Sequence, residues 1–460
     1  MIKKLLISVI LLISLIYFGT SFLIGKERLL NFKELITQEN RTLIKKIFFP
    51  YKFISQLENR IEGYEIELKD LKYDLTTNRE YEFKTKNADV YFDKREKIIL
   101  DNSLSLRKYK ILEGFHHGIH PKSSGTGYIQ FYNNNFFIVS ATGVLAYGKV
   151  SDESFTLKQI KTNLESFLSS KTVKKDGWFT IRDLYIDDNK IYISFNNELK
   201  EDCWNTGIVY SNLNTEEMKF EKLFISDECI VFNEKRDKKI KEFNANQSGG
   251  RITSINSKEI LFTIGDYRSR DLVQDTNSIF GKIHKMNIEN KQAEIFSIGH
   301  RNPQGLLFDK ENNLVLSTEH GPKGGDEINL IKLNNDKIPN YGWPIASYGE
   351  HYGGRSKKNK EKYEKYPLLK SHKDNGFIEP LKSFQPSIGI SQITHLGEKK
   401  YVVSSMIAKS IYFFDLNEKN EINEIAKVNV GERVRDITFY DGKLYLLLEN
   451  SASLGVIEVS

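Results

Sequence analysis

Short apolar segments occur in pairs along the chain after about residue 100, and six such pairs follow one another. Each segment is rich in Tyr, Phe, Ile and Val, and Asn, Asp, Lys or Gly residues stand at its ends. This pattern is typical of short β-strands joined by tight turns. The polar turns that open the six pairs lie at Asn134, Asn189, Lys258, Asn313, Lys400 and Gly442. We therefore expect an all-β domain.

The return of one unit six times indicates a fold built from repeats. A single strand pair cannot bury both of its faces, so neighbouring units must pack against each other. Six units around one axis predict a six-bladed β-propeller over residues 100–460, whereas a β-sandwich would need shorter and more even spacing. The loops on one face of a propeller converge on a central channel, where a flat ligand could bind.

The first 26 residues have a different pattern. Lys3 and Lys4 are followed by twenty uncharged residues, Leu5 to Ile24. A helix of that length spans a hydrocarbon core of about 30 Å. Because no cleavage site stands out, we expect residues 1–26 to be an uncleaved signal anchor in the inner membrane rather than a cleaved signal peptide. The two lysines favour a cytoplasmic N-terminus, which would leave a single-pass protein with its propeller on the periplasmic side.

A helical stalk is predicted between the anchor and the propeller, over residues 27–80. Apolar residues within 57–75 are spaced alternately by four and three positions, as in a short coiled coil. That reading predicts a homo-oligomer joined at the membrane. The alternative is an amphipathic helix that acts as a spacer or packs on the main domain.

The composition excludes several classes. The chain carries 67 Lys and Arg against 61 Asp and Glu. The resulting net charge of +6 is too dilute over 460 residues to indicate a nucleic-acid partner. The 12 % aromatic content is not that of a disordered chain. Two cysteines cannot build a disulfide-rich scaffold. In an oxidising compartment a bridge between Cys203 and Cys229 is favoured over two buried thiols.

Polar and small residues are concentrated in the loops of one segment, residues 299–344. Arg301 supplies a fixed charge and a fork of donors suited to carboxylate or carbonyl oxygen. Asn302 supplies both a donor and an acceptor. Gly321 and Pro322 can expose backbone carbonyls, and hard acidic oxygens follow them at Asp326 and Glu327. Together these oxygens suit calcium, although a solvated acidic turn would have the same sequence.

Three stretches here, GHRNPQGL, EHGPKGGDEIN and NYGWP, occur in an order and spacing that resembles a known family. The family is that of the soluble dehydrogenases for glucose and sorbosone that depend on pyrroloquinoline quinone (PQQ), including the aldose sugar dehydrogenases. The resemblance is dense over residues 245–345, returns at Arg433–Asp436, thins over 110–240 and is absent before about residue 100. It implies a six-bladed propeller, in agreement with the count of repeats.

The resemblance implies a hydride transfer from a sugar or other alcohol to PQQ. Arg301 and Asn302 resemble the pair that holds and polarises the quinone carbonyls, where a fixed positive charge would stabilise the developing oxyanion. Arg433 and Arg435 resemble the arginines that hold the carboxylates of the cofactor. Their spacing on a strand puts both guanidinium forks on one face. A surface or inter-blade ion pair is the alternative for each arginine.

The family also binds Ca²⁺ beside the cofactor. Gly321 and Pro322 resemble the positions whose backbone oxygens hold the cofactor's ion. Asp326, Glu327 and Tyr341 resemble the positions around a second, structural ion. The resemblance thus implies two cofactors, PQQ and Ca²⁺.

The chain departs from the family where the proton is transferred. The family has a histidine, its general base, four residues before an arginine, but here Gln247 precedes Arg251 by four. A neutral amide cannot accept a proton near pH 7. Residues 177–183 and 389–391 also depart from the family's pattern. His116, His117 and His120 could bind a metal or replace the base, or they could belong to a glycine-rich loop.

Two functions from different classes follow. The resemblance favours a quinoprotein oxidoreductase that acts on a sugar or other alcohol. The change at Gln247 favours instead a non-catalytic relative that binds a carbohydrate or an envelope partner. A hydrolase of the lactonase kind is a third reading, because a fold does not determine a function.

Overall fold

The computed structural model describes single positions and short runs between residues 54 and 71, and then longer stretches of the chain. The longer stretches are residues 90–91, 95–100, 104–110, 127–150, 155–169, 180–233 and 243–459. The chain divides into two compact units, Met1–Leu71 and Lys72–Ser460.

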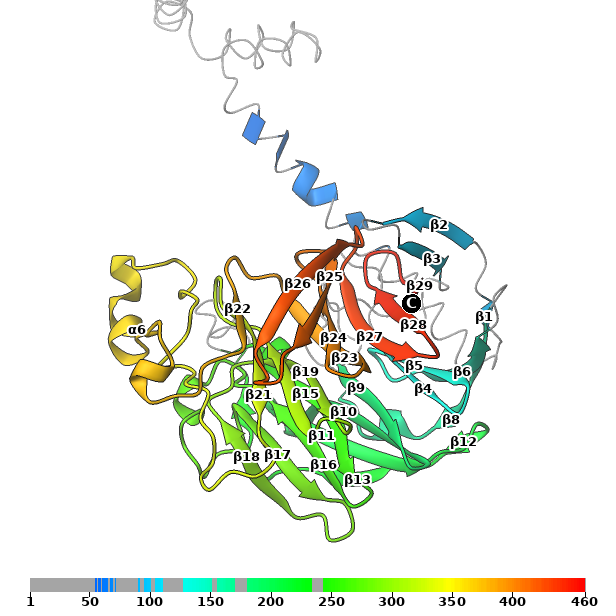
Figure 1. Ribbon diagram of the computed structural model, residues 1–460, viewed down its shortest axis with the longest axis horizontal. Helices are drawn as coiled ribbons and strands as arrows, with labels where there is room; N and C mark the ends of the chain where they lie inside the picture. Colours follow the sequence, from blue (N-terminus) through cyan, green and yellow to red (C-terminus); the bar gives the residue numbers. More distant parts are fainter. Residues whose placement is uncertain are drawn as a thin grey trace, which may run out of the picture. The chain divides into compact units, whose positions relative to one another are not determined.

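Six antiparallel sheets of four or five strands make up the larger unit (Figure 1). The strands of each sheet are given from the inside outwards. The first sheet consists of β4 (Gly127–Tyr132), β5 (Asn135–Ser140), β6 (Leu145–Val150), β7 (Phe155–Gln159) and β1 (Val90–Tyr91). The second consists of β9 (Ile181–Asp187), β10 (Lys190–Lys200) and β11 (Cys203–Asn212), and both β13 (Glu221–Phe224) and β14 (Ile230–Val231) pair with β11. The third consists of β15 (Gly249–Asn256), β16 (Glu259–Ile264), β17 (Lys282–Asn287) and β18 (Ala293–Ile298).

The other three sheets follow the same order. The fourth sheet consists of β19 (Pro303–Asp309), β20 (Leu314–Glu319), β21 (Asp326–Ile331) and β22 (Lys382–Phe384). The fifth consists of β23 (Ile390–Gly397), β24 (Lys400–Ser405), β25 (Ser410–Leu416) and β26 (Ile422–Asn429). The sixth consists of β27 (Val434–Tyr440), β28 (Lys443–Leu448), β29 (Ser453–Glu458), β3 (Ser105–Lys110) and β2 (Arg95–Ile99).

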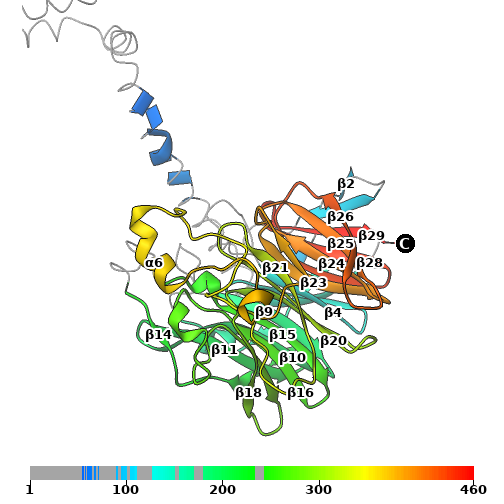
Figure 2. The same cartoon turned by 60° about the vertical axis from the view of Figure 1, so that its left-hand side comes forward.

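The innermost strands of the six sheets form a closed ring. Each of β4, β9, β15, β19, β23 and β27 contacts the next, and β27 returns to β4. Apolar clusters fill the spaces between neighbouring blades, as between Phe136 on β5 and Leu447 on β28. Each of these six sheets is a blade, and Figure 2 shows them from a second direction. The predicted all-β six-bladed propeller is confirmed.

The last blade closes the ring with strands from both ends of the sequence. Its inner strands β27, β28 and β29 come from the C-terminal end, and its outer strands β3 and β2 come from residues 95–110. The sheets thus include strands before residue 100, where the sequence pattern places the start of the propeller. The outer strand β2, with the sequence REKII, ends in an exposed Ile99, so it lacks the apolar alternation of a half-buried strand.

Tight turns connect each inner strand with the second strand of its blade. Asn133 and Asn134 have φ of 47° and 61°, and Asp188 and Asn189 have φ of 47° and 57°. Two successive residues with positive φ match the twist of a hairpin, and Asn and Asp tolerate that conformation best after glycine. One face of the propeller is therefore closed by short turns, and the longer loops project from the other.

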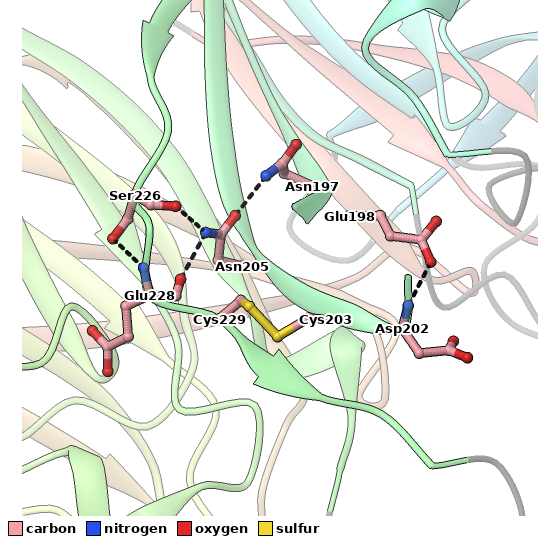
Figure 3. The surroundings of a disulfide bond; sticks show 8 residues. All are labelled: Asn197, Glu198, Asp202, Cys203, Asn205, Ser226, Glu228 and Cys229. Carbon is pink, nitrogen blue, oxygen red and sulfur yellow. Dashed lines mark hydrogen bonds between the residues drawn. A yellow bond between two sulfur atoms is a disulfide. The ribbon is translucent and has the colours of Figure 1, made fainter. Parts of the chain in front are cut away.

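The two cysteines are joined in the second blade. Cys203 begins β11, and Cys229 lies just before the short strand β14, which pairs with the start of β11. The sulfur atoms are bonded (Figure 3). Beside the bond, the Asn205 amide donates to the backbone oxygens of Ser226 and Glu228, at 2.8 Å each. The bridge and this amide hold the 226–231 segment against the blade.

The remaining elements are short. Parallel strands β8 (Lys161–Thr162) and β12 (Glu217–Met218) pair on the outside of the second blade. One α-helix, α6 (Lys360–Lys365), lies in the long connection between β21 and β22 within the described part of this unit. The 3₁₀ turns in the same stretches are η2 (Leu164–Ser166), η4 (Ala245–Gln247), η5 (Arg270–Leu272), η6 (Lys357–Asn359) and η7 (Lys373–Asn375).

The described positions of the smaller unit, which lie between residues 54 and 71, are helical, and most of the predicted stalk, residues 27–80, lies outside the described residues. The apolar side chains at the predicted coiled-coil positions are exposed: Leu57, Ile61, Tyr64, Leu68 and Leu71. The predicted anchor, residues 1–26, lies outside the described residues. Among those residues, no helix is long and apolar enough to span a bilayer.

Candidate active site

The predicted site residues project from one rim of the propeller. In each blade, the loop before the inner strand and the loop after the second strand emerge at the same end, because adjacent strands are antiparallel. Arg301 and Asn302 precede β19, Gln247 precedes β15, and Arg433 precedes β27. Gly321 and Pro322 follow β20. The fold therefore gathers residues that are far apart in the sequence.

Gln247 is buried at the centre of a polar network. With each end of its amide facing a complementary partner, the side chain donates to Asp266 Oδ1 at 3.0 Å. Its oxygen then accepts from Arg268 Nε at 3.0 Å and from Arg301 Nη2 at 3.1 Å. The amide thus connects a carboxylate with two guanidinium groups, a role in which it moves no proton.

Three arginines crowd around the single carboxylate of Asp266. The other Asp266 oxygen accepts from Trp343 Nε1 at 2.9 Å, and the Trp343 ring lies 5.5 Å from the Arg301 guanidinium and 5.7 Å from that of Arg270. Both distances are within the range of a cation–π contact. Burial lowers the pKa of Arg268 and of Arg270, and the charge of Arg301 lowers both further. This part of the rim is strongly cationic.

Arg433 and Arg435 share one buried carboxylate. Arg433 Nε donates to Glu449 Oε2 at 2.7 Å, and Arg435 Nε donates to Glu449 Oε1 at 2.7 Å. Burial alone would raise the pKa of Glu449, but the two arginines hold it at about 2. Each guanidinium carries five N–H donors, more than these contacts use. The two arginines therefore share one negative charge within their blade, and one positive charge is left over.

His320 links the two groups of arginines. It follows β20, and its backbone N–H donates to Asn302 O at 3.0 Å while its backbone oxygen accepts from Arg301 Nη1 at 2.7 Å. Burial lowers the pKa of the imidazole to about 4, Asp326 opposes this shift, and the charges of Arg301, Arg435 and Arg433 add to it. The three arginines predicted to hold PQQ thus act on one neutral imidazole.

The Asn302 side chain is fixed by its neighbours. Its Oδ1 accepts from Gly249 N at 3.2 Å and from Gln304 Nε2 at 3.0 Å. These bonds tie the start of β19 to the start of β15, the strand that follows Gln247. The structure therefore brings Gln247, Arg301 and Asn302 together.

The turn after β20 is held tightly. Gly324 N and Gly325 N donate to Ser387 Oγ at 2.9 and 3.2 Å, and Ser387 Oγ donates to Pro322 O at 3.2 Å. At Gly321 a Cβ atom would come within 1.7 Å of the Gly325 oxygen, so only glycine fits there. These contacts fix the positions of the backbone oxygens in this turn, as binding of a hard cation would require.

Asp326 and Glu327 point to opposite faces of β21. The Asp326 carboxylate accepts from three backbone N–H groups, those of Gly321, Gly389 and Ile390. The Glu327 carboxylate lies on the other face, beside Glu319 on β20. The two carboxylates therefore have different surroundings, whereas the resemblance implied that both lie around one structural ion.

Glu319 and Glu327 form a buried pair of like charges. Burial raises the pKa of Glu327 well above its usual value, and Glu319 raises it further. His300 Nδ1 lies 3.1 Å from Glu319, and the ring of Tyr341 stacks on His300. Close by, His372 Nε2 lies 3.9 Å from Glu327. Buried acidic oxygens of this kind fit a divalent cation.

A buried ion triad lies between the inner strands, beneath the rim. Arg251 Nη1 lies 2.8 Å from Asp183 on β9 and 2.9 Å from Asp436 on β27. Its Nε donates to Gln304 O on β19 at 2.7 Å, and its guanidinium lies 4.9 Å from the Tyr128 ring on β4. One arginine therefore joins five of the six inner strands and forms the floor of the site.

The other departures from the family pattern fall in the same region. Within residues 177–183 the structure describes the last four positions, and Asp183 belongs to the triad. Of residues 389–391, Gly389 N bonds Asp326, and Ser391 Oγ donates to Arg435 O at 2.6 Å. These positions support neighbouring blades. His116, His117 and His120 lie outside the described residues.

Three side chains at the rim were not among the predicted site residues, and each follows the second strand of its blade. Asp266 comes just after β16, His320 after β20 and Glu449 after β28. All three have polar side chains directly behind an apolar strand that ends at the loop-bearing face. That common position is the signal that could have identified them. No sequence pattern marks Arg268, apart from its position two residues after Asp266.

These observations define a class: a six-bladed propeller with a closed floor and a cationic rim. The chain belongs to the glucose/sorbosone dehydrogenase family, whose model matches residues 179–455. That family consists of oxidoreductases related to PQQ-dependent sugar dehydrogenases.

Curated relatives agree with this assignment. The chain is 25 % identical over 291 residues to an aldose sugar dehydrogenase of Escherichia coli, covering 58 % of this chain and 72 % of that protein. It is 31 % identical over 135 residues to quinoprotein glucose dehydrogenase B of Acinetobacter calcoaceticus, covering 23 % and 27 %. A match to an uncharacterised protein of Synechocystis, 29 % identical over 234 residues, covers 44 % of this chain and about half, 53 %, of that relative.

Solved structures share the fold. The apo-form of the soluble aldose sugar dehydrogenase of Escherichia coli superposes with a TM-score of 0.61 at 21 % identity, over 77 % of this chain and 99 % of that one. The PQQ-bound aldose sugar dehydrogenase of Streptomyces coelicolor gives a TM-score of 0.53 at 18 % identity, over 73 % and 93 %. At these identities the likeness supports the propeller architecture alone.

Proposed function

We propose that this protein is a quinoprotein-like oxidoreductase that acts on an aldose or other alcohol. The observation that carries the proposal is the cluster of three arginines, Arg301, Arg433 and Arg435, whose charges meet at His320 on one rim. PQQ is a flat polyanion, and a cationic rim above a closed floor suits such a ligand. The aldose sugar dehydrogenase of Streptomyces coelicolor was solved in a PQQ-bound form, which supports PQQ as the proposed cofactor.

Each arginine would have its own task. Arg301 is held by His320 O and by Gln247, so its guanidinium is fixed before a ligand arrives. Preorganised donors of this kind stabilise developing negative charge without a cost of reorganisation. Arg433 and Arg435 keep one surplus charge after pairing with Glu449, and their remaining donors would hold carboxylates.

The residues present also fit calcium. The backbone oxygens of Gly321 and Pro322 would hold an ion next to the cofactor, and Asp326 stiffens that turn from behind. Glu327, with Glu319 and the region of Tyr341, would hold a second ion, which would relieve the repulsion between the two buried carboxylates.

Oxidation of an aldose to its lactone removes two electrons and two protons. PQQ, when bound, supplies the two-electron acceptor. The chain must then take the hydroxyl proton, and Gln247 cannot do so. The neutral His320 is able to accept a proton, but its pKa of about 4 makes it a weak base near pH 7.

Gln247 therefore supports a second candidate function. A propeller that has kept the scaffold, with or without the cofactor pocket, but has lost its base would bind a carbohydrate or an envelope partner without turnover. Loss of one general base typically costs about 10²–10⁴-fold in rate, so slow oxidation remains compatible with the first proposal.

We infer a membrane location from the N-terminal sequence. The uncharged run Leu5–Ile24 would anchor the chain in the inner membrane and leave the propeller in the periplasm. The apolar positions of 57–75, which are exposed as far as they are described, would join copies of the chain. Fractionation and crosslinking of the full chain, compared with a chain that starts at residue 81, test both points. Soluble full chain would refute the anchor, and equal monomer content would refute the coiled coil.

Reconstitution tests the function. The full chain is loaded with PQQ and Ca²⁺, and reduction of an artificial dye is followed over a panel of aldoses and alcohols. Turnover would support the oxidoreductase. Binding of PQQ without turnover would support the non-catalytic relative, and absence of PQQ binding would refute the quinoprotein oxidoreductase.

A further inference from the structure

Positive charge is concentrated in one stretch of the long connection between β21 and β22. We call residues 355–373 the basic segment, which carries eight Lys or Arg residues and two Glu residues. This excess of six equals the formal net charge of +6 of the whole chain, so the remaining residues together carry no net charge. A charge excess concentrated in this way is typical of a surface that attracts an anionic partner.

The charges of the basic segment are exposed to solvent. The segment includes η6 and α6, which lie at the edge of the propeller (Figure 1). Lys357 and Lys358 are exposed, and neither forms an ion pair within the part of the chain that the structure describes. Lys360 lies 3.8 Å from Glu364, and the two side chains are 79 % and 64 % exposed. Such an exposed pair is weak, so the ammonium group stays open to other anions.

Internal contacts support the backbone that carries these lysines. Asn359 Nδ2 donates to the backbone oxygens of Tyr352 and Gly354, at 3.0 and 2.7 Å. His351 Nε2 lies 2.8 Å from the backbone oxygen of Tyr366. The backbone of η6 and α6 is therefore held in place before a partner arrives, which lowers the entropic cost of docking.

The basic segment adjoins the candidate active site. Leu368 is buried in one apolar cluster with Trp343, whose ring lies 5.5 Å from the Arg301 guanidinium. Tyr366 Oη donates to Asp271 at 2.7 Å, in the η5 turn that follows β16 on the rim. A partner bound to the basic segment would therefore lie next to the rim at which PQQ is proposed to bind.

We propose that the basic segment is the docking surface of an acidic redox protein, which accepts the electrons removed from the sugar. The inference rests on the proposed function, since only an oxidoreductase has electrons to deliver. Each turnover removes two electrons and two protons from the sugar. The electrons pass from the reduced quinone to the partner, which is reduced by one or two electrons at a time, and the protons are released to water.

The position of the segment favours a redox protein over an anionic membrane or polymer. The segment adjoins the site that must lose its electrons before the next turnover, and neither a lipid nor a polymer would accept them. Complementary charge steers an acidic protein towards this rim and speeds its association. The exposed Tyr352 beside the lysines fits the aromatic content of a protein interface.

Binding to the full chain tests the surface without turnover. Cytochrome b5, an acidic haem protein, and cytochrome c, a basic one, are each titrated against the full chain. We expect cytochrome b5 to bind more tightly, with an affinity that falls by about tenfold or more between about 20 mM and about 200 mM salt. Equal binding of the two cytochromes, or no binding of cytochrome b5, would overturn the inference.

Charge-reversal variants locate the docking surface. Three substitutions in the basic segment should together weaken binding of cytochrome b5 by about tenfold or more: Lys357→Glu, Lys358→Glu and Lys360→Glu. A matched control reverses three exposed lysines at turns on the opposite face and should leave the affinity nearly unchanged: Lys258→Glu, Lys310→Glu and Lys400→Glu. Equal losses in both variants would overturn the inference. So would binding to phosphatidylglycerol vesicles through the three lysines of the basic segment without binding of cytochrome b5, since it would assign the surface to a membrane.

Reoxidation of the loaded protein separates this inference from the function on which it rests. After reduction by an aldose, the protein with PQQ and Ca²⁺ is mixed with ferricyanide, a trianion, or with tris(phenanthroline)cobalt(III), a trication. We expect the variant of the basic segment to react about tenfold or more slowly with ferricyanide and no more slowly with the cobalt complex. If the aldose is oxidised and the ferricyanide rate is unchanged, the oxidoreductase stands and the docking surface is refuted. If no aldose reduces the loaded protein while cytochrome b5 still binds through the three lysines, the oxidoreductase fails and the docking surface stands.

Discussion

At the scale of single residues, Gln247 decides between the two candidate functions. Its amide is held between Asp266 and two arginines, so it is a well-fixed structural group at the position of a base. An imidazole there would contact Asp266, which would orient the ring and stabilise its cationic form. The identity of one side chain therefore separates binding of a sugar from its oxidation.

We predict that Gln247→His raises the dye-linked kcat with PQQ and Ca²⁺ by about 10²-fold or more, because it supplies the missing base. Gln247→Asn is the control, since it keeps an amide but provides no base. Single-turnover kinetics measures the effect. A kcat for Gln247→His no higher than that of the unchanged protein, with PQQ bound equally in both, would mean that another group takes the proton.

Glu449 provides a prediction about acid stability. Its folded pKa of about 2 lies below the ordinary value of 4.5 because Arg435 and Arg433 stabilise the carboxylate. The contribution is therefore present above about pH 4.5 and lost as pH falls towards 2, and it amounts to about 3 kcal/mol. Denaturant unfolding from pH 7 to pH 2.5 measures it. Glu449→Gln should lower the unfolding free energy at pH 7 and flatten its fall in acid. Exposed Glu458→Gln should change neither.

At the scale of elements, the disulfide secures the outer part of the second blade. Cys203 and Cys229 enclose β11 and β13, and the bridge holds β14 against the start of β11. Removal of a bridge that closes a loop of this length costs roughly 3 kcal/mol. Replacement of both cysteines by alanine should lower the denaturation midpoint without abolishing the propeller. The same midpoint in oxidised and reduced samples of the unchanged protein would contradict this expectation.

The sequence predicted the second and third strands of each blade but not the inner strands. Segments such as β10 and β11 are apolar and bounded by turn residues, so their pattern is local. The inner strands carry buried polar residues, including Asp183, Arg251 and Asp436, whose partners lie on other blades. Such pairs form only after the ring has closed, and no periodicity in one segment can reveal them.

The same limit applies to the candidate site. Arg301 and Asn302 were predicted because they stand in a motif, as were Arg433 and Arg435. Glu449 was not predicted, because it acts through the two arginines and lies far from the motif. Residues of that kind become visible only when three-dimensional structure brings loops of different blades together.

At the scale of the whole molecule, closure of the ring depends on residues 95–110. Strands β2 and β3 complete the blade that begins with β27, and β3 pairs with β29 along five residues. A chain that starts at residue 111 should leave the apolar edge of β29 uncovered and should unfold at a lower temperature or aggregate. A chain that starts at residue 81 is the control. Equal melting temperatures would mean that the ring closes without these strands.

Binding of PQQ to the cationic rim can be measured by an absorbance titration of the full chain with PQQ in the presence of Ca²⁺. We predict saturable binding of one PQQ per chain. We also predict that the double substitution Arg433→Gln and Arg435→Gln weakens binding by a hundredfold or more, about 2.7 kcal/mol, while Arg107→Gln leaves it unchanged. Absence of saturable binding, or equal binding by the double variant, would mean that the rim is not a PQQ site.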